Sequence, residues 1–453
     1  MSTPTLAWAR TTLIVLTAIN FLNYIDRYVL AAVVESVRVD FVLDDADAGL
    51  LGLMFIVVYT IASPFAGWFG DRGTRKWMVV GGVALWSLAT LGCAFARDYH
   101  ELLLMRSLVG IGEAGYATVA PGMIADLFAA ERRGRMLAWF YLAIPVGSAL
   151  GYVLGGTVAG HHEALLDAIG MAGATDQGWR VAFAVAGVPG LLSALAAAWL
   201  PEPVRGRHDG AAGGTTRIDD PIAAVRRLFA SPAWRATTGG MVLMTFALGG
   251  LAFWMPTFLQ RAHGMDEAAA GSVFGGLTVV GGLIATMAGG WLGDRAQARS
   301  GGGYLRVSGW GLVVGAPAVL LLALLDLRLA VLILAFVAEF FLFLNTGPLN
   351  AALVGCVPAN LRASSMAINV LMIHALGDAL SPWLMGVCSR ELGPGLVGVL
   401  GSSAEAAGLR LAIGVLALPL VIGGLWLLRG AARLDREPQG LLAIDEPRPR
   451  ASA

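Results

Sequence analysis

Long apolar runs separated by short polar segments occupy almost the whole chain. Each run is close to the length of about 20 residues that an α-helix needs to cross the hydrocarbon core of a bilayer. The runs lie at about residues 10–35, 47–69, 77–96, 101–127, 135–159, 179–200, 235–260, 267–292, 304–325, 329–354, 364–388 and 408–428. Because lipid offers no hydrogen-bond partners to an exposed backbone, such runs fold as helices. The sequence therefore predicts an all-α membrane protein with twelve transmembrane helices.

Composition supports this class and argues against others. Asp, Glu, Lys and Arg make up 14% of the 453 residues, against about 25% in an ordinary soluble domain. The formal net charge is zero, so we expect no nucleic-acid partner. Cys93, Cys356 and Cys388 lie in or beside apolar runs without the spacing of metal ligands, and we interpret them as packing residues. Neither a soluble enzyme nor a metal site is expected.

The longest polar interruption covers residues 201–233 and is rich in Gly, Pro and charged residues. It predicts a linker between two pseudo-symmetric halves of six helices each, residues 1–200 and 234–429. Residues 430–453 end in DEPRPRASA and are expected to form a disordered tail.

The distribution of basic residues predicts the orientation. Most of the 31 Lys and Arg residues fall on the side of the N-terminus, and Lys and Arg are retained on the cytoplasmic side of a membrane. The first apolar run contains Asp26 and Arg27 and lacks a small-residue cleavage site, so we interpret it as a membrane helix and not as a signal peptide. Nearly all basic residues are arginine, which suggests a GC-rich genome. We expect a multi-pass protein of a bacterial inner (plasma) membrane, with the linker and both termini in the cytoplasm.

An internal repeat relates the two halves. GWFGDR at residues 67–72 returns as GWLGDR at residues 290–295, and GSALGYVLGG at residues 147–156 matches GDALSPWLMG at residues 377–386. Glu113 and Glu339 stand at nearly the same offset. Parallel repeats of six helices are the sequence signature of a transporter architecture whose substrate site lies near the bilayer midplane.

The two copies of the short loop are candidate gates. A carboxylate there can bond the N-terminus of a neighbouring helix, and basic side chains can pair across the gap between the halves. Solvated loop charges are the alternative, and duplication favours gating. The second copy continues as AQARSGGGYLR, which predicts a weaker latch. The gating candidates are Gly67, Asp71, Arg72, Arg75, Asp294 and Arg295.

Four charged residues inside the apolar runs are the strongest site candidates: Asp26, Arg27, Arg106 and Glu113. Charges at bilayer depth are costly unless they pair or face a cavity. Arg106 and Glu113 are seven residues apart, on one face of a helix, so a cluster of two acids and two arginines is possible. A structural ion-pair network is the alternative. A conformational change that alters the desolvation or pairing of a carboxyl group takes up or releases a proton, which is the physical requirement for proton coupling.

Further polar and aromatic residues in the runs are candidates for substrate binding. His374 and Asp378 are four residues apart on one helical face, and Pro382 cannot donate to the carbonyl of Asp378; this polar notch predicts substrate contact, a hinge or a packing site. A cavity that mixes aromatic side chains with a few charges suits an amphipathic ligand. The substrate-binding candidates are Asn20, Asn23, Tyr24, Tyr116, Trp254, Glu339, His374 and Asp378.

The loop GWFGDRGTRK, the helix segment RSLVGIGEAG and the layout of six plus six helices resemble the major facilitator superfamily over nearly the whole chain. Within it, NFLNYIDRY, RSLVGIGEAGYATVAP, AIPVGSALGYVLGG and HALGDALSPWLMG resemble the spinster family of lysolipid transporters. The resemblance implies the major facilitator fold, alternating access, and a lysophospholipid or similar single-chain amphiphile as substrate. It also implies that Asp26, Arg27, Arg106 and Glu113 are coupling and cavity residues.

A proton-linked multidrug exporter and an organic-anion uptake carrier stay open as alternatives. An enzyme is not expected, because His374 is the only histidine well inside a run. The phosphate-binding motif GxxxxGK[ST] is absent, so transport is expected to be secondary. We expect no cofactor apart from the proton as coupling ion, a lipid-like small molecule and the lipid bilayer as partners, and a monomer.

Overall fold

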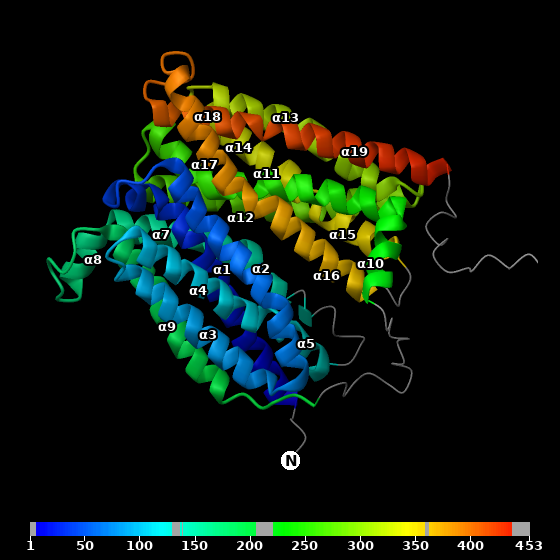
Figure 1. Ribbon diagram of the computed structural model, residues 1–453, viewed down its shortest axis with the longest axis horizontal. Helices are drawn as coiled ribbons and strands as arrows, with labels where there is room; N and C mark the ends of the chain where they lie inside the picture. Colours follow the sequence, from blue (N-terminus) through cyan, green and yellow to red (C-terminus); the bar gives the residue numbers. More distant parts are fainter. Residues whose placement is uncertain (1–5, 129–135, 138, 205–220, 358–361, 437–453) are drawn as a thin grey trace, which may run out of the picture. The chain divides into compact units, whose positions relative to one another are not determined.

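A computed structural model describes residues 6–128, 136–137, 139–204, 221–357 and 362–436 (Figure 1). Twelve helical segments are long and apolar enough to cross a membrane: Ala7–Asp40, Asp45–Gly70, Arg75–Ala94, Tyr99–Leu127, Trp139–Gly160, Gly178–Ala198, Pro232–His263, Glu267–Gln297, Gly303–Leu324, Arg328–Gly355, Ser365–Leu396 and Ala404–Arg436. No β-strand occurs among these residues, and the one β-bridge joins Val397 to Gly401. The predicted all-α fold with twelve membrane helices is confirmed.

The individual helices are numbered in Figure 1. Those of the first half are α1 (Leu6–Asp40), α2 (Asp45–Arg72), α3 (Arg75–Ala94), α4 (Tyr99–Ala117), α5 (Ala120–Leu127), α7 (Ala143–Gly160), α8 (His162–Ala168) and α9 (Gly178–Ala198). The others are α10 (Pro221–Ala230), α11 (Pro232–His263), α12 (Glu267–Gln297), α13 (Gly303–Leu324), α14 (Arg328–Phe343), α15 (Thr346–Gly355), α16 (Arg362–Ile373), the π-helix η2 (His374–Asp378), α17 (Leu380–Leu392), the 3-10 helix η3 (Gly393–Leu396), α18 (Ala404–Val415) and α19 (Ala417–Arg436).

The predicted helix 135–159 has a turn at Leu142 before α7 begins, and four further predicted helices are interrupted four residues before a proline. A proline cannot donate a hydrogen bond to the carbonyl four residues before it. The carbonyls freed in this way belong to Ala117, Leu344, Asp378 and Val415, which stand at the ends of α4, α14, η2 and α18; the prolines are Pro121, Pro348, Pro382 and Pro419. A proline alone does not determine whether a helix is interrupted, because four others lie inside unbroken helices: Pro64, Pro189, Pro256 and Pro317.

Three boundaries differ clearly from the sequence prediction. The first helix continues from residue 35 to Asp40, since the charged residues Glu35 and Arg38 pair with each other at 3.0 Å. The predicted linker 201–233 contains the helix α10, whose Leu228 is buried. The last helix continues from residue 428 to Arg436, because Leu434 is buried and Asp435 bonds both the backbone N–H of Gly302 and the side chain of Arg306. The predicted tail from residue 437 onward lies outside the described residues.

The chain forms two compact units. Unit 1 comprises Met1–Gly213, Gly250–Val280 and Ala379–Ala412, and unit 2 comprises Gly214–Gly249, Gly281–Asp378 and Ile413–Ala453. The boundaries of these units cross helices of the second half, so unit 1 includes the first half together with all of α17 and parts of α11, α12 and α18. The division of the chain into six-helix halves at residues 1–200 and 234–429 stays a prediction.

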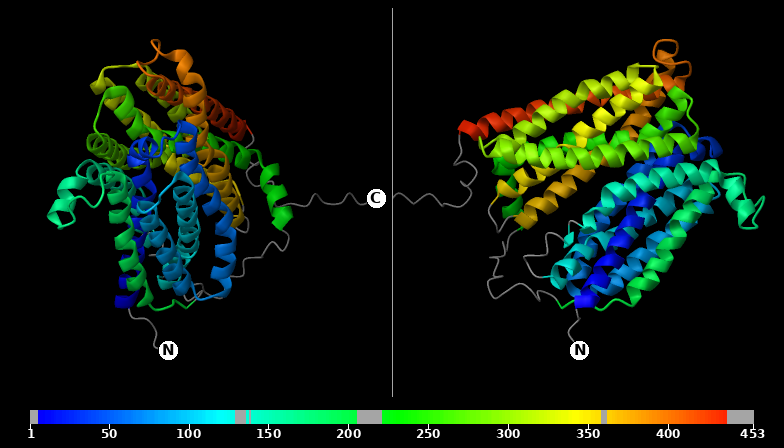
Figure 2. Two further views of the ribbon diagram at one scale, coloured as in Figure 1. Left: turned by 60° about the vertical axis from the view of Figure 1, so that its left-hand side comes forward. Right: turned by 180° about the vertical axis from the view of Figure 1, so that it is seen from behind.

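Small residues bring the helices of unit 1 into close contact. The stripe Gly147, Gly151 and Gly155 of α7 faces α1, and a methyl group at Gly151 would lie 2.6 Å from the carbonyl oxygen of Ile25. Figure 2 shows α1, α7 and α9 side by side in this unit. Such small-residue seams are the usual means of helix association in membranes.

Unit 2 is packed by the same means. A methyl group at Gly424 of α19 would lie 2.7 Å from the carbonyl oxygen of Gly309 in α13. Between α12 and the end of α14, a methyl group at Gly289 would overlap the carbonyl of Leu344. Backbone-to-backbone packing therefore holds these helices, and larger side chains there would force them apart.

Candidate functional site

Two ion pairs lie inside unit 1, between α1 and α4. The first joins Arg27 to Glu113, with 2.6 Å between Nε and Oε2. The Glu113 side chain has no exposed surface and that of Arg27 has 18%. This pair is therefore closed and tightly bonded, and Arg27 is its more accessible member.

The second pair is looser. Arg106 Nη1 lies 3.9 Å from Asp26 Oδ1, beyond hydrogen-bond reach, although both side chains are almost completely buried. The other carboxylate oxygen, Oδ2, accepts a 2.5 Å hydrogen bond from the hydroxyl of Thr90 in α3. Asp26 is thus hydrogen-bonded to Thr90 and not to the guanidinium of Arg106.

Helix geometry positions these four groups. Arg106 and Glu113 are two turns apart on one face of α4, as their spacing predicts. Between them, Gly110 lets α4 approach α2 so closely that a methyl group there would lie 2.5 Å from the carbonyl oxygen of Phe55. The ring of Phe55 consequently reaches both arginines, at 5.2 Å from the guanidinium carbon of Arg27 and 5.1 Å from that of Arg106.

Aromatic rings enclose Arg27 on further sides. Its guanidinium carbon lies 5.2 Å from the ring centroid of Tyr24 and 4.9 Å from that of Tyr59. Rings at these distances stabilise a cation through their electron-rich faces. Tyr24, a candidate from the sequence, therefore lies at the charged cluster. Phe55 and Tyr59 also line the cluster, although the sequence analysis did not select them.

The cluster leaves several buried polar atoms without hydrogen bonds. Among the described residues, Asp26 Oδ1, Arg106 Nε and Nη1, and Glu113 Oε1 have no such partner. Buried polar atoms in proteins are nearly always satisfied. These unsatisfied atoms distinguish the cluster from a fully hydrogen-bonded ion-pair network.

Four other predicted residues of unit 1 are also buried. Asn23 is buried on α1, one turn before Arg27. The remaining three each donate to a backbone carbonyl: Asn20 to Phe140 at 3.0 Å, the Tyr116 hydroxyl to Leu16 at 2.6 Å, and Trp254 Nε1 to Pro382 at 2.9 Å. They fix neighbouring segments to one another; contact with a ligand stays a prediction for them.

Unit 2 holds the three remaining candidates. His374 and Asp378 face each other across one turn of the π-helix η2, with 3.0 Å between Nδ1 and Oδ1. A π-helical turn is common at functional sites. Glu339 in α14 is buried, and its Oε2 has no hydrogen-bond partner in the described part of the chain. Of the two repeat-related acids, Glu113 thus pairs with an arginine, whereas no ion pair of Glu339 occurs among the described residues.

The first gating loop is braced within unit 1. Arg75 at the start of α3 contacts Asp126 at 2.6 Å, Glu202 at 3.2 Å and the carbonyl of Pro203 at 3.1 Å. This guanidinium therefore ties the end of α5 to the segment after α9. Sequence reasoning did not select Asp126 or Glu202, which are 51 and 127 residues away from it.

The other gating candidates have simpler surroundings. Arg72 lies over the Trp68 ring at 4.2 Å, and Gly67 borders open space. Asp71 stands near the end of α2, and its side chain lies outside the described part of the structure. In unit 2, Asp294 accepts a 2.8 Å hydrogen bond from the Tyr304 hydroxyl, and Arg295 lies over the Trp291 ring at 5.5 Å.

A second charged cluster of unit 1, missed from the sequence, surrounds the turn between α1 and α2. Arg261 of α11 contacts Glu35 of α1 at 2.6 Å and Asp45 of α2 at 2.8 Å. The hydroxyl of Ser389 in α17 donates to the same Asp45 at 2.5 Å. Three segments far apart in the chain are therefore joined by these contacts.

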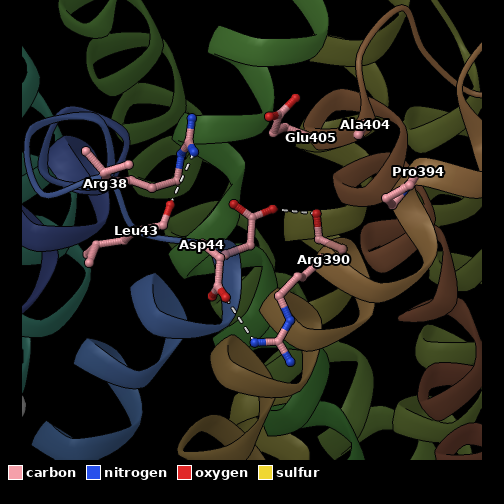
Figure 3. Close-up of a pocket in the computed structure, with 10 residues that line it drawn as sticks. Arg38, Leu43, Asp44, Arg390, Pro394, Ala404 and Glu405 are labelled. Carbon is pink, nitrogen blue, oxygen red and sulfur yellow. Dashed lines mark hydrogen bonds and ion pairs between the residues drawn. The ribbon is translucent and has the colours of Figure 1, made fainter.

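A cavity of about 360 Å³ opens beside this cluster. Figure 3 shows Arg390 of α17 reaching Asp44, at 3.0 Å, and Arg38 donating to the carbonyl of Leu43. Burial raises the pKa of Asp44, but hydrogen bonds from the Asp47 N–H and from Arg390 outweigh it, so this pKa lies below its ordinary value. The pair is ionised at neutral pH.

No group of three or more His, Cys, Asp or Glu side chains that could hold a metal ion occurs in the ranges that the structure describes. The charged clusters combine carboxylates with arginines, which neutralise them.

Comparison with known proteins places this geometry in a family. The model of the Major Facilitator Superfamily matches residues 16–382. Protein spinster of Drosophila melanogaster is 34% identical over 392 residues, which cover 84% of this chain and 62% of that protein. Protein spinster homolog 1 of Xenopus tropicalis is 32% identical over 459 residues, which cover 96% of this chain and 84% of that protein. The chain belongs to the spinster family of the major facilitator superfamily.

A solved structure supports the same assignment for the whole spinster-family fold. A bacterial homologue of the human lysosomal transporter Spinster, in an inward-facing and unoccupied conformation, superposes with a TM-score of 0.85 at 25% identity, covering 99% of this chain and all of that one. The predicted family and fold are confirmed, and the chain is a multi-pass membrane transporter, not an enzyme. The matched part of this chain spans about three fifths of the length of the Drosophila spinster protein.

Proposed function

We propose that this spinster-family transporter is driven by protons and moves a lysophospholipid or a similar single-chain amphiphile by alternating access. The observation that carries the proposal is the buried cluster Asp26, Arg27, Arg106 and Glu113, in which one ion pair is closed and the other is open. The proton is the coupling ion, and no other cofactor is required.

The asymmetry of the two pairs supports the coupling role. Two carboxylates and two guanidiniums balance, so adding a proton leaves one positive charge in excess at a buried site. Such a charge is costly unless the groups around it rearrange. Asp26 Oδ1 and Arg106 Nη1 lack hydrogen-bond partners, so this pair has the freedom to close or separate as Asp26 gains or loses a proton.

The surroundings of Arg27 support an amphiphilic substrate. Arg27 is the partly exposed cation of the cluster, and three aromatic rings surround it. A guanidinium recognises the phosphate of a head group, and each methylene of an acyl chain that leaves water contributes about 0.8 kcal/mol. A single-chain amphiphile would place its polar head group at the guanidinium of Arg27 and its apolar tail among apolar side chains.

The orientation belongs to the same proposal. With the excess of arginines inside, both termini face the cytoplasm of a bacterial cell and the transporter lies in the inner (plasma) membrane as a monomer. The Arg75 brace is then cytoplasmic, and the cluster around Arg261 faces the opposite side. Membrane-impermeant labelling of a cysteine introduced at the exposed Val42, beside Arg38, tests this: it should react in intact cells.

Transport into proteoliposomes tests the function. We expect uptake of a lysophospholipid to accelerate when a pH gradient is imposed and to stop when a protonophore removes it. Affinity should rise with acyl length until the apolar site for the acyl chain is filled, and a second acyl chain should weaken it sharply. A flat length series with tight binding of a cationic dye would replace the proposal by a drug exporter, and preference for small organic anions would replace it by an uptake carrier.

A further inference from the structure

Helix α10, in the segment between the two halves, exposes apolar side chains. The exposed fractions are 63% for Ile222, 38% for Val225 and 41% for Phe229. Their spacing of three and four residues places them on one side of the helix. In water, this stripe would be an unfavourable surface.

The other described side chains of α10 differ in their surroundings. Leu228 is completely buried and anchors the helix to unit 2. Arg226 and Arg227 are both exposed. Arg226, four residues after Ile222 and three before Phe229, borders the apolar stripe, whereas Arg227 lies on the opposite side of the helix. The helix sequence PIAAVRRLFA contains no acidic residue. The helix therefore has a buried anchor, an apolar stripe bordered by one arginine, and a second arginine on the side opposite the stripe.

The turn at Ser231 fixes the direction of α10. The Ser231 N–H bonds the carbonyls of Arg227 and Leu228, at 3.2 and 3.0 Å, and its hydroxyl accepts from the N–H of Trp234. Arg235 of α11 donates to the carbonyl of Phe229 at 2.8 Å. Figure 1 shows α10 turned steeply away from the direction of α11. Because α11 is long enough to span the membrane, the turn stands at the level where a membrane helix begins.

We propose that α10 lies in the interface of the bilayer, with Ile222, Val225 and Phe229 among acyl chains and Arg226 and Arg227 at anionic phospholipid head groups. An amphipathic helix with an apolar stripe and arginines outside it is the type that settles at this depth. The occupant is an anionic lipid of the adjoining leaflet and not a protein, because the helix is tied to the start of a membrane helix and carries charges of one sign.

The position of the helix also gives this contact a role. Lipids that hold α10 at the membrane surface fix the entry of the chain into the second half. Residues 221–230 are then an anchored helix at the start of the second half. This inference is independent of the transported substrate and of proton coupling.

Depth measurements by electron paramagnetic resonance test the placement. The full chain, with C93S, C356S and C388S, carries one nitroxide at position 225, 229 or 227 in nanodiscs containing phosphatidylglycerol. We expect collisions with oxygen to exceed collisions with a nickel chelate at positions 225 and 229, and the reverse at 227. Equal nickel accessibility at all three positions would overturn the proposal.

The charge component is tested on the chain with its own cysteines. Native mass spectrometry of the detergent-purified protein compares retention of phosphatidylglycerol with that of phosphatidylcholine. R226Q and R227Q should each lower the preference for phosphatidylglycerol about fivefold. The matched control R328Q changes an exposed arginine at the start of α14 and should leave it unchanged. No preference in the unchanged protein, or an equal loss in the control, would contradict lipid binding by α10.

Discussion

Thr90 holds one oxygen of Asp26 at 2.5 Å while Arg106 stands 3.9 Å from the other. The carboxylate of α1 is thus bonded to a neutral hydroxyl of α3 more closely than to the cation of α4. A free ion pair in a dry site would close to hydrogen-bond distance. Thr90 therefore sets the position from which Asp26 meets Arg106.

Replacing Thr90 by valine should destabilise the protein. Valine keeps the shape and removes the donor, which leaves a buried carboxylate oxygen unsatisfied at a cost of about 1–3 kcal/mol. Thr90→Ser keeps the hydroxyl and is the matched control. Thermal unfolding followed by intrinsic fluorescence in detergent should show a lower Tm for valine only; equal Tm values for the two variants would mean that this hydrogen bond contributes nothing to stability.

Neutral variants of the two acids test proton coupling. Asp26→Asn and Glu113→Gln keep side-chain shape and lose the ability to titrate. We expect both proteins to fold and to bind a lysophospholipid, but to lose acceleration by an imposed pH gradient in proteoliposomes. A variant whose transport keeps the pH dependence of the unchanged protein would remove that residue from the coupling role.

Removal of Arg106 should be more damaging than either neutral variant. Arg106→Ala leaves Asp26 buried without its nearest cation, and breaking a buried pair in this way costs about 3–5 kcal/mol. Expression and Tm should fall, and Asp26→Asn in the same chain should restore part of the loss because it removes the stranded charge. Without such rescue, the role of Arg106 lies in packing against Phe55, 5.1 Å from its guanidinium.

The fold could be predicted because apolar length and a sequence repeat determine it. The charged cluster could also be predicted from the sequence. Helical periodicity places Arg106 and Glu113 on one face, and charged residues inside apolar runs are conspicuous because they are costly in lipid. The polar notch at Asp378 before Pro382 was predicted, but the interruptions of the other helices were missed, although each stands shortly before a visible proline such as Pro121. Other prolines leave their helices intact, so sequence alone does not tell which ones matter.

Partners that depend on tertiary packing could not be found in this way. Thr90 is a common helix residue with no charge, and nothing near it in the sequence points to Asp26. The contacts of Arg261 with Glu35 and Asp45 join residues 226 and 216 positions apart. Leu228 looked like part of a polar linker, because charged neighbours concealed the amphipathic pattern of a short helix.

Loss of Arg261 should open this end of unit 1. Its guanidinium satisfies Glu35 and Asp45 together, and both carboxylates are nearly buried, so Arg261→Gln strands two charges. Spin labels at the exposed Val42 and Val399 should show a broader and longer distance distribution in the variant. Arg97→Gln, which breaks an exposed pair with Glu101, is the control and should leave it unchanged. An unchanged distribution in Arg261→Gln would exclude a closing role.

The pair of Asp44 and Arg390 should contribute stability that depends on pH. The folded-state pKa of Asp44 lies below its ordinary value, after burial, which raises it, is outweighed by the Asp47 N–H and Arg390. A depressed carboxyl pKa adds stability above the unfolded pKa of about 3.9, and this stability disappears as the pH falls through the folded value. Because the two side chains are 37% and 42% exposed, the contribution is less than about 1 kcal/mol.

Asp44→Asn keeps the N-cap of α2, since asparagine caps as well as aspartate does, and removes only the charge. The Tm of the variant should therefore lie slightly below that of the unchanged protein at pH 7, and the two should converge below about pH 4. A Tm difference that persists unchanged at pH 3 would show that charge is not the cause.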